Sequence, residues 1–112
     1  MIIEKPWGKE EILENNNKYV LKKLTMYAGH RCSLQFHKFK KETVFVLSGR
    51  LKIIKGSNLN SLEENIYISG DFITIPPKLI HRMEGVEDSV YLEASTSELD
   101  DVFRLADDYK RV

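Results

Sequence analysis

The chain has 112 residues, 42% hydrophobic and 30% charged, which is the size and composition of one globular domain. We therefore predict a single domain over residues 1–112. Its 17 basic and 17 acidic residues cancel, which argues against nucleic acid and an anionic membrane as partners. A lone cysteine, Cys32, rules out an internal disulfide, and the first residues lack the apolar stretch of a signal peptide. We expect a cytoplasmic protein with no membrane-spanning segment.

Short apolar runs, rich in β-branched and aromatic residues, follow one another along the chain and are separated by turn residues. They predict strands over residues 19–27, 31–36, 43–47, 51–54, 65–68, 71–75 and 89–94. Ser48-Gly49-Arg50 predicts a tight hairpin turn between two of these strands, with glycine supplying a positive φ.

The last part of the chain, residues 97–109, has mixed spacing. Leu99, Val102, Phe103 and Leu105 fit either a short C-terminal helix or a final strand, and both alternatives stay open. The many short strands before this segment predict an all-β sandwich or closed barrel of the small jelly-roll type.

Four polar residues have the types and the placement of metal ligands. Gln35 and His37 are two positions apart, so on a strand they point to the same face. Glu42 follows after a short turn, on what we expect to be the next strand, and His81 comes from a distant strand. Imidazole nitrogens with carboxylate and amide oxygens suit one divalent ion. Zinc is the expected ion, with Mn, Fe, Ni or Co as alternatives.

Two stretches of the chain resemble the two motifs of the cupin superfamily. The first runs through Gly29, Gln35-Phe36-His37, Glu42 and Gly49, and the second through Gly70, Pro76 and His81. Many cupins have histidine where this chain has Gln35. The setting Ser33-Leu34-Gln35-Phe36-His37 is similar to type II phosphomannose isomerases and to the C-terminal domain of bifunctional mannose-1-phosphate guanylyltransferase–phosphomannose isomerases. The resemblance implies a cupin double-stranded β-helix with a metal held by Gln35, His37, Glu42 and His81.

The resemblance extends over nearly the whole chain, from Pro6-Trp7-Gly8 to Asp107-Asp108-Tyr109. The positions at which the chain differs from the family are those expected to face the substrate. The family usually has arginine at Lys40, an aromatic residue at Val44, glycine at Lys78 and asparagine at Gly85. The metal ligands are thus kept while their surroundings differ, which predicts sugar or sugar-phosphate chemistry in general.

Three cationic residues flank the ligands and are the catalytic candidates: Lys40, Lys78 and Arg82. A lysine can hold a phosphate as a point charge, so Lys40 and Lys78 predict a phosphate site where their loops meet. The plainer expectation is that both are solvated at the surface. Arg82 follows a ligand directly and should face away from the metal, where a structural ion pair with an acid such as Glu84 or Glu93 competes with a functional role.

The strands that carry the ligands are apolar on both faces. Cys32, Leu34 and Phe36 are expected to point away from the metal, and Phe45 and Leu47 to lie opposite Val44 and Val46. Strands of this kind are buried on both sides, by a second sheet or a second subunit, and the simplest interpretation is a homodimer.

The expected function is aldose–ketose isomerisation of the mannose-6-phosphate isomerase type, assisted by the metal. The general base stays open among Lys40, Lys78 and an inward-facing acid. One alternative is a non-catalytic cupin that binds a sugar or acts in a nucleotide-sugar pathway. Another is a different metal-dependent cupin enzyme such as a dioxygenase, because a fold does not fix a reaction.

Overall fold

Eleven β-strands and no helix make up residues 1–110, the part of the chain that the computed structural model describes. The strands are β1 (Ile2–Lys5), β2 (Gly8–Asn15), β3 (Val20–Met26), β4 (Leu34–Phe36), β5 (Glu42–Ser48), β6 (Arg50–Gly56), β7 (Glu63–Ile68), β8 (Phe72–Ile75), β9 (Ile80–Gly85), β10 (Ser89–Ser95) and β11 (Phe103–Ala106). Residues 1–110 contain no helix long and apolar enough to cross a membrane.

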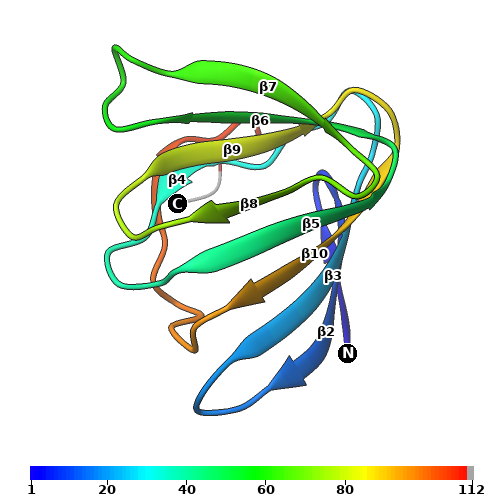
Figure 1. The fold of residues 1–112 in the computed structure, drawn as a ribbon, viewed down its shortest axis with the longest axis vertical. Helices are drawn as coiled ribbons and strands as arrows, with labels where there is room; N and C mark the ends of the chain where they lie inside the picture. Colours follow the sequence, from blue (N-terminus) through cyan, green and yellow to red (C-terminus); the bar gives the residue numbers. More distant parts are fainter. Residues whose placement is uncertain (111–112) are drawn as a thin grey trace.

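The strands form two antiparallel sheets that lie face to face and curve into a barrel (Figure 1). One sheet has six strands in the order β1-β2-β3-β10-β5-β8, and the other has five in the order β11-β4-β9-β6-β7. The chain crosses between the sheets from β4 to β5 and from β9 to β10, so residues distant in sequence meet inside the barrel. The prediction of an all-β jelly-roll fold is confirmed.

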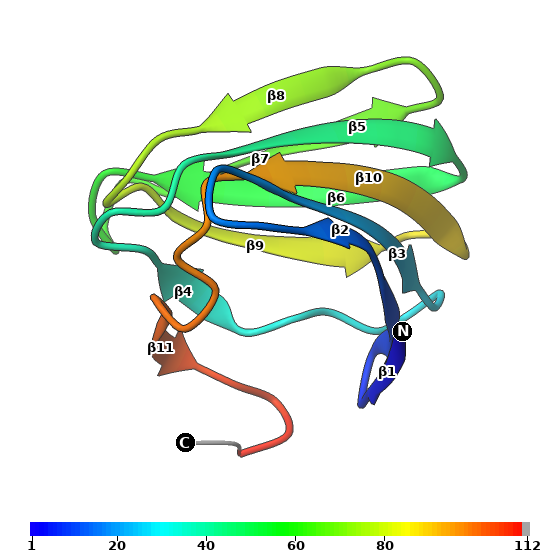
Figure 2. The same cartoon turned by 90° about the horizontal axis from the view of Figure 1, so that it is seen from below.

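The C-terminal helix, one of the two open alternatives, is wrong. Residues 103–106 form β11 beside β4, and the Phe103 ring stacks on Phe36 with a centroid distance of 5.1 Å. An edge strand that can pair with β4 satisfies the backbone of this segment better than one isolated helical turn would. Figure 2 shows the terminal strands β1 and β11 projecting on the same side of the molecule.

Most predicted strands are present, with two kinds of error. The run over residues 31–36 is a strand only in its second half, since Arg31 makes an isolated bridge with Glu84 before β4 begins. Strands β1, β2 and β9 were not among the predicted runs because their sequences carry many charged residues. The hairpin at Gly49 is confirmed, with φ at 88° between β5 and β6.

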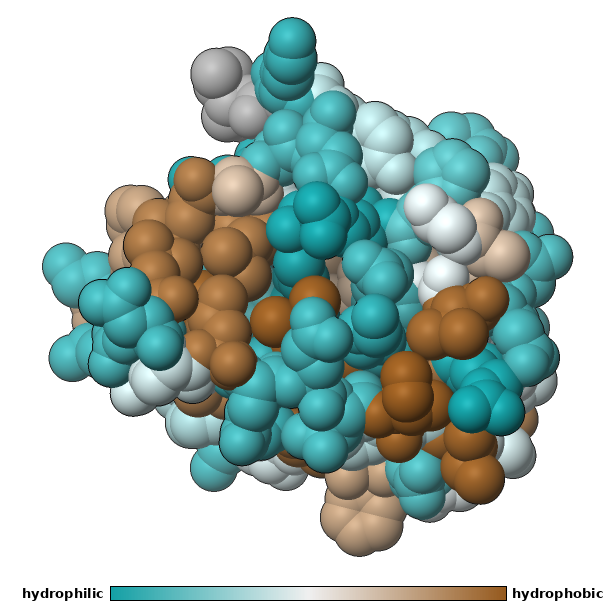
Figure 3. Space-filling view, turned by 90° about the horizontal axis from the view of Figure 1, so that it is seen from above, coloured by the Kyte–Doolittle hydropathy of each residue, from teal (hydrophilic) through white to brown (hydrophobic). Residues whose placement is uncertain are grey.

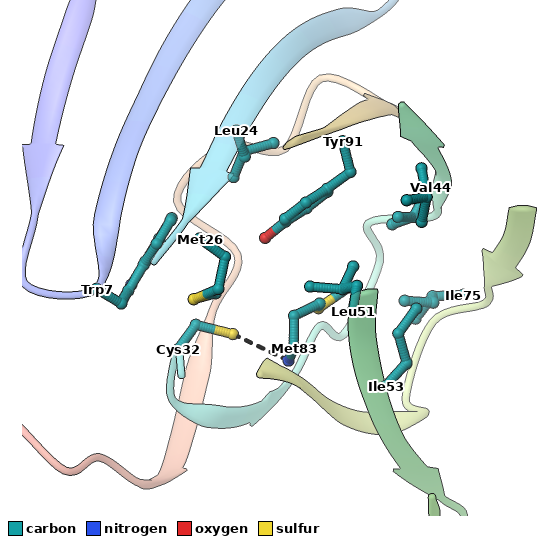
Figure 4. Packing of buried hydrophobic residues seen from close by; sticks show 11 residues of the cluster. Trp7, Leu24, Met26, Cys32, Val44, Leu51, Ile53, Ile75, Met83 and Tyr91 are labelled. Atoms are coloured by element: carbon teal, nitrogen blue, oxygen red, sulfur yellow. Dashed lines mark hydrogen bonds between the residues drawn. The ribbon is translucent and has the colours of Figure 1, made fainter. Parts of the chain in front are cut away.

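The hydrophobic core fills the space between the sheets (Figure 4). Its buried members are Trp7, Leu24, Met26, Cys32, Val44, Val46, Leu51, Ile53, Ile75, Met83 and Tyr91. Tyr91 extends from β10 into this space, and the Cys32 sulfur accepts a hydrogen bond from the Met83 backbone N–H at 3.3 Å. Burial raises the pKa of the Cys32 thiol to about 11, so this cysteine is a packed small hydrophobe and no nucleophile.

The outer face of the six-stranded sheet leaves apolar side chains in solvent. Val44 and Val46 are fully buried, whereas Phe45 and Leu47 on the other face of β5 are exposed, as alternation predicts. Phe72 of β8 lies opposite Phe45 and is 69% exposed. The side of the molecule seen in Figure 3 carries one continuous hydrophobic patch on the left and a smaller hydrophobic group on the lower right, with hydrophilic residues between them. The homodimer stays a prediction.

Candidate metal centre

The four predicted ligands come from three parts of the barrel and converge on its interior. Gln35 is the central residue of β4 and lies opposite His81 of β9 in the register of the five-stranded sheet. His37 follows β4 directly, and Glu42 is the first residue of β5 in the other sheet. The crossing from β4 to β5 therefore carries His37 and Glu42 toward each other.

His37, Glu42 and His81 form a buried triad that could hold a metal ion, with ligand atoms within 4.8 Å of one another. The Nε2 atoms of His37 and His81 lie 3.1 and 3.0 Å from the same oxygen, Glu42 Oε1. All three residues are at most 2% exposed. Such proximity of three buried polar groups is costly unless they share a proton or a cation.

The hydrogen bonds of the two imidazoles indicate that the triad needs a cation. His37 Nδ1 donates to the Asp101 carbonyl at 2.6 Å, and His81 Nδ1 donates to the Leu79 carbonyl at 2.9 Å. A neutral imidazole protonated on Nδ1 carries a lone pair on Nε2, so two neutral rings would direct acceptor atoms at the Glu42 carboxylate, which is itself an acceptor. His81 Nε2 has no hydrogen-bond partner within residues 1–110. This donor set fits a divalent cation, and the backbone bonds at Nδ1 are the orienting contacts that metal-binding histidines usually make.

Gln35 stands beside this triad. Its Oε1 accepts a hydrogen bond from the Ser33 hydroxyl at 2.6 Å, which leaves a second lone pair on that oxygen. Gln35 and Cys32 both line the interior cavity. The expectation that Cys32 points away from the metal face is therefore wrong, because residues 31–33 precede β4 and do not follow its alternation.

A cavity of about 470 Å³ opens from the triad into the barrel. Its apolar wall includes Trp7, Leu24, Met83 and Tyr91. Its polar lining includes Gln35, Glu42 and His81, together with Lys5, Glu10, Lys22, Lys40, Glu93, Asp100 and Arg104. A concave, mostly pre-formed site with a few converging polar groups is the usual form of a small-molecule site.

Lys40 lies inside this cavity, and the expectation of a solvated lysine is wrong. Only 4% of the residue is exposed, and its Nζ lies 3.6 Å from Glu93 Oε1 and 3.9 Å from Glu42 Oε2. The loop after β4 turns inward at this point, so the ammonium group compensates two buried carboxylates. Lys40 is thus next to the metal-binding triad, though its charge is already balanced.

Burial and mutual contact set the charges of this group. Burial would lower the pKa of Lys40, but Glu93 and Glu42 outweigh it and raise that pKa, so the lysine stays protonated. Burial would raise the pKa of Glu42, but the neighbouring imidazoles and Lys40 hold it well below its ordinary value. Burial, followed by the Glu42 carboxylate, raises the pKa of Glu93 to about 8. One buried acid is therefore ionised while its neighbour retains its proton more readily.

The other two catalytic candidates lie outside the cavity lining. Lys78 is exposed, which agrees with the expectation of a solvated surface lysine. Its backbone N–H donates a hydrogen bond to the His37 carbonyl, so the two loops do meet. Arg82 faces away from the triad as predicted and is 6% exposed. Its partners are the Cys32 carbonyl at 3.0 Å and Asp108 at 3.6 Å. The predicted structural ion pair is therefore present, but its acid is Asp108 and neither of the two named examples; Glu84 is engaged by Arg31 and Lys52.

Asp101, in the segment before β11, holds the metal-binding loop in place. Its carboxylate accepts hydrogen bonds from the backbone N–H groups of Lys38, Phe39 and Lys40 at 3.0, 2.6 and 2.9 Å. Its carbonyl receives the hydrogen bond from His37 Nδ1. Burial would raise the pKa of Asp101, but these N–H groups outweigh it and lower that pKa. One residue thus fixes both the His37 ring and the loop that leads to Glu42.

We expect Asp101→Ala to lower the affinity for a divalent metal by about 10-fold, because contacts that orient metal ligands are worth that much. Competition with a chromogenic chelator measures the affinity. Asp71→Ala is the matched control, since Asp71 is an exposed aspartate outside the cavity lining whose carboxylate likewise accepts a backbone hydrogen bond, from Ile68 at 2.9 Å. Equal metal affinity of Asp101→Ala and the unmodified chain would show that the loop keeps its shape without the carboxylate.

Six charged residues of the cavity lining were not among the predicted site residues: Lys5, Glu10, Lys22, Glu93, Asp100 and Arg104. Lys22 shares the alternation of Val20, Leu24 and Met26 and therefore points inward. A charge at an inward position of an otherwise apolar strand face is the indication that was available.

Solved structures of several differently named proteins have the same fold as this chain. The capsular polysaccharide assembling protein CapF from Staphylococcus aureus aligns with a TM-score of 0.82 at 17% identity, over 95% of this chain and 34% of CapF. KdgF from Halomonas sp. aligns with a TM-score of 0.78 at 16% identity, over 90% of this chain and 91% of KdgF. These likenesses establish the cupin fold alone.

Relatives with similar sequences identify the family as well as the fold. Mannose-1-phosphate guanylyltransferase of Escherichia coli is 31% identical over 98% of this chain, which spans 23% of that enzyme. ManC of Salmonella typhimurium, also a mannose-1-phosphate guanylyltransferase, is 30% identical over 98% of this chain and 23% of its own length. The chain thus spans about a quarter of these relatives. The model of the mannose-6-phosphate isomerase C-terminal family matches residues 1–107, and this chain belongs to that family of cupin domains.

Proposed function

We propose that the chain is a metal-dependent aldose–ketose isomerase acting on a sugar phosphate of the mannose 6-phosphate type. The observation that carries the proposal is the buried triad of His37, Glu42 and His81 at one end of a ligand-sized cavity. Membership of the mannose-6-phosphate isomerase C-terminal family supports the substrate class. The names of the relatives, which act on mannose 1-phosphate, support the same pathway chemistry.

Gln35, His37, Glu42 and His81 would hold the divalent ion. When bound, such an ion polarises a carbonyl or hydroxyl oxygen of the substrate as a Lewis acid. The backbone contacts of both histidines keep their Nε2 atoms directed at this point. The apolar wall formed by Trp7, Leu24 and Tyr91 limits the water that reaches the reacting carbons.

Proton transfer between adjacent carbons needs a group within hydrogen-bond reach of the substrate. Glu93 and Lys40 line the cavity beside Glu42, with 3.6 Å between their charged atoms. We assign the transfer to this pair, with Glu93 as the inward-facing acid and Lys40 as the cation that stabilises negative charge. Lys78 is a weaker candidate because it is exposed and does not line the cavity.

The phosphate needs a different place from the one that Lys40 and Lys78 suggested. Lys40 is already engaged by Glu42 and Glu93, and Lys78 does not line the cavity. Lys5 of β1 and Arg104 of β11 line the cavity, and their strands project on the same side of the barrel (Figure 2). We place the phosphate at this end, away from the acidic triad.

The second candidate is a sugar-binding domain without catalysis. The names of the relatives favour it, since they are guanylyltransferases by name and not isomerases. The chain also has Lys40 and Val44 where the family usually has arginine and an aromatic residue, and these changes near the metal ligands favour the same alternative. In this alternative the same cavity binds the sugar phosphate, and the ligand leaves unchanged.

The test is an assay of the metal-loaded chain for interconversion of mannose 6-phosphate and fructose 6-phosphate. We expect turnover that disappears in Glu93→Gln and persists in Glu84→Gln, a control on the strand bearing His81 but outside the cavity lining. Binding of mannose 6-phosphate without turnover would support the non-catalytic candidate. Neither binding nor turnover in a chain that holds metal would overturn both.

A further inference from the structure

A second charged group lies in the cavity, on the strands beyond Glu93. Glu10 of β2 and Lys22 of β3 form an ion pair of 3.2 Å, and their side chains are only 12% and 10% exposed. Both residues line the cavity. Neither is part of the buried triad, and the proposed isomerisation uses neither.

The sheet register places this pair in line with the triad. Lys22 lies opposite Glu93 across β3 and β10, and Ser95 of β10 lies opposite Glu42 of β5. The inner face of the six-stranded sheet therefore carries a row of ionisable residues from Glu42 through Glu93 and Lys22 to Glu10. From β5 to β3 the row covers two strand spacings, roughly 10 Å. That length is comparable to an extended six-carbon sugar phosphate.

A purely structural role explains this pair poorly. Removing two charges from water is expensive, and apolar residues of similar volume often stabilise a core better than a buried pair does. Here the pair borders a cavity, with Trp7 and Leu24 among the apolar residues that line it. The carboxylate can accept a hydrogen bond and the ammonium group can donate one, while the indole and leucine surfaces suit C–H groups. Neighbouring hydroxyls on a carbon chain satisfy both charges at once.

We propose that Glu10 and Lys22 form a subsite that recognises the sugar hydroxyls remote from the metal. The inference rests on the proposed function and adds to it a requirement for the substrate. The ligand is a hexose phosphate whose middle hydroxyls bridge Glu10 and Lys22. Lys22 donates to one of these hydroxyls and Glu10 accepts from its neighbour.

The experiment combines protein variants with deoxygenated ligands, measured calorimetrically on metal-loaded protein. The ligands are mannose 6-phosphate and its 3-deoxy and 4-deoxy analogues, and the variants are Lys22→Met and Glu10→Gln. Lys52→Met is the control, since Lys52 pairs with Glu84 at 3.3 Å outside the cavity lining. We expect Lys22→Met to weaken mannose 6-phosphate binding by about 10-fold, the effect of one hydrogen bond to a charged group.

The coupling between variant and ligand decides the matter. The unmodified chain should bind at least one deoxy analogue about 10-fold more weakly than mannose 6-phosphate. Lys22→Met should bind that analogue and mannose 6-phosphate with equal affinity. Should Lys22→Met fold poorly, Glu10→Gln/Lys22→Met removes both charges and serves the same comparison.

Equal affinity of the unmodified chain for all three ligands would overturn the subsite without any variant. A loss in Lys22→Met that is the same for every ligand would overturn it too, because such a loss does not depend on the hydroxyl. In either case isomerisation by the unmodified chain leaves the proposed function standing. Failure of the metal-loaded chain to bind any of the three ligands would instead remove the proposed function together with the subsite.

Discussion

His81→Ala is expected to remove the bound divalent ion and to leave a folded β-protein. The substitution deletes one of the two Nε2 atoms that face Glu42, and three remaining ligands hold a cation much less tightly. Elemental analysis after gel filtration should give one ion per unmodified chain and much less than one per variant. Far-ultraviolet circular dichroism should show the same β content in both.

Loss of the ion should also lower the melting temperature of the unmodified chain. A ligand at 100 times its dissociation constant stabilises the folded state by about 2.7 kcal/mol. For a domain of this size the shift is on the order of 10 °C. His30→Ala is the control, because His30 is the third histidine and is exposed. Full metal occupancy in His81→Ala would refute the assignment of this ligand.

Lys40→Met should destabilise the metal-free protein by about 3 kcal/mol, because it leaves the buried, ionised Glu42 without its nearest cation. The cost is at the low end of the range for a broken buried pair, since Glu93, with its pKa raised to about 8, adds little negative charge at neutral pH. Urea denaturation at neutral pH, after chelation of metal, measures the free energy of unfolding.

Two further variants make the Lys40 measurement specific. Lys40→Met/Glu42→Gln should recover most of the lost stability, because it removes the ionised carboxylate that Lys40→Met leaves unpaired. Lys41→Met, the exposed neighbour, should change stability by less than about 0.5 kcal/mol. A Lys40→Met variant as stable as Lys41→Met would mean that Lys40 contributes no net stabilisation to this buried group.

The sequence predicted the strands that carry alternating apolar residues and failed where charge replaced that pattern. Strands β3, β5 and β10 follow the alternation, and Gly49 marks the hairpin between β5 and β6. Strand β9 reads Ile-His-Arg-Met-Glu-Gly, so the residues that build the site conceal the strand that holds them. The choice at residues 103–106 depended on pairing with β4, a contact between distant parts of the chain.

The same distinction holds for the site. Motif spacing placed His37, Glu42 and His81 together, because each lies at or beside the end of a strand whose position the fold fixes. The burial of Lys40 had no local indication, since it depends on Glu93 from β10 and on Asp101 from the C-terminal segment. Arg82 likewise forms its ion pair with Asp108, which lies beyond β11 and could not be located from the sequence.

The metal centre is tested most directly by crystals of the metal-loaded chain, with diffraction recorded on both sides of the absorption edge of the bound metal. The account predicts one anomalous peak, within bonding distance of Gln35 Oε1, His37 Nε2, a Glu42 carboxylate oxygen and His81 Nε2. A peak bound elsewhere on the chain, or a loaded crystal with no peak between the two histidines, would contradict it.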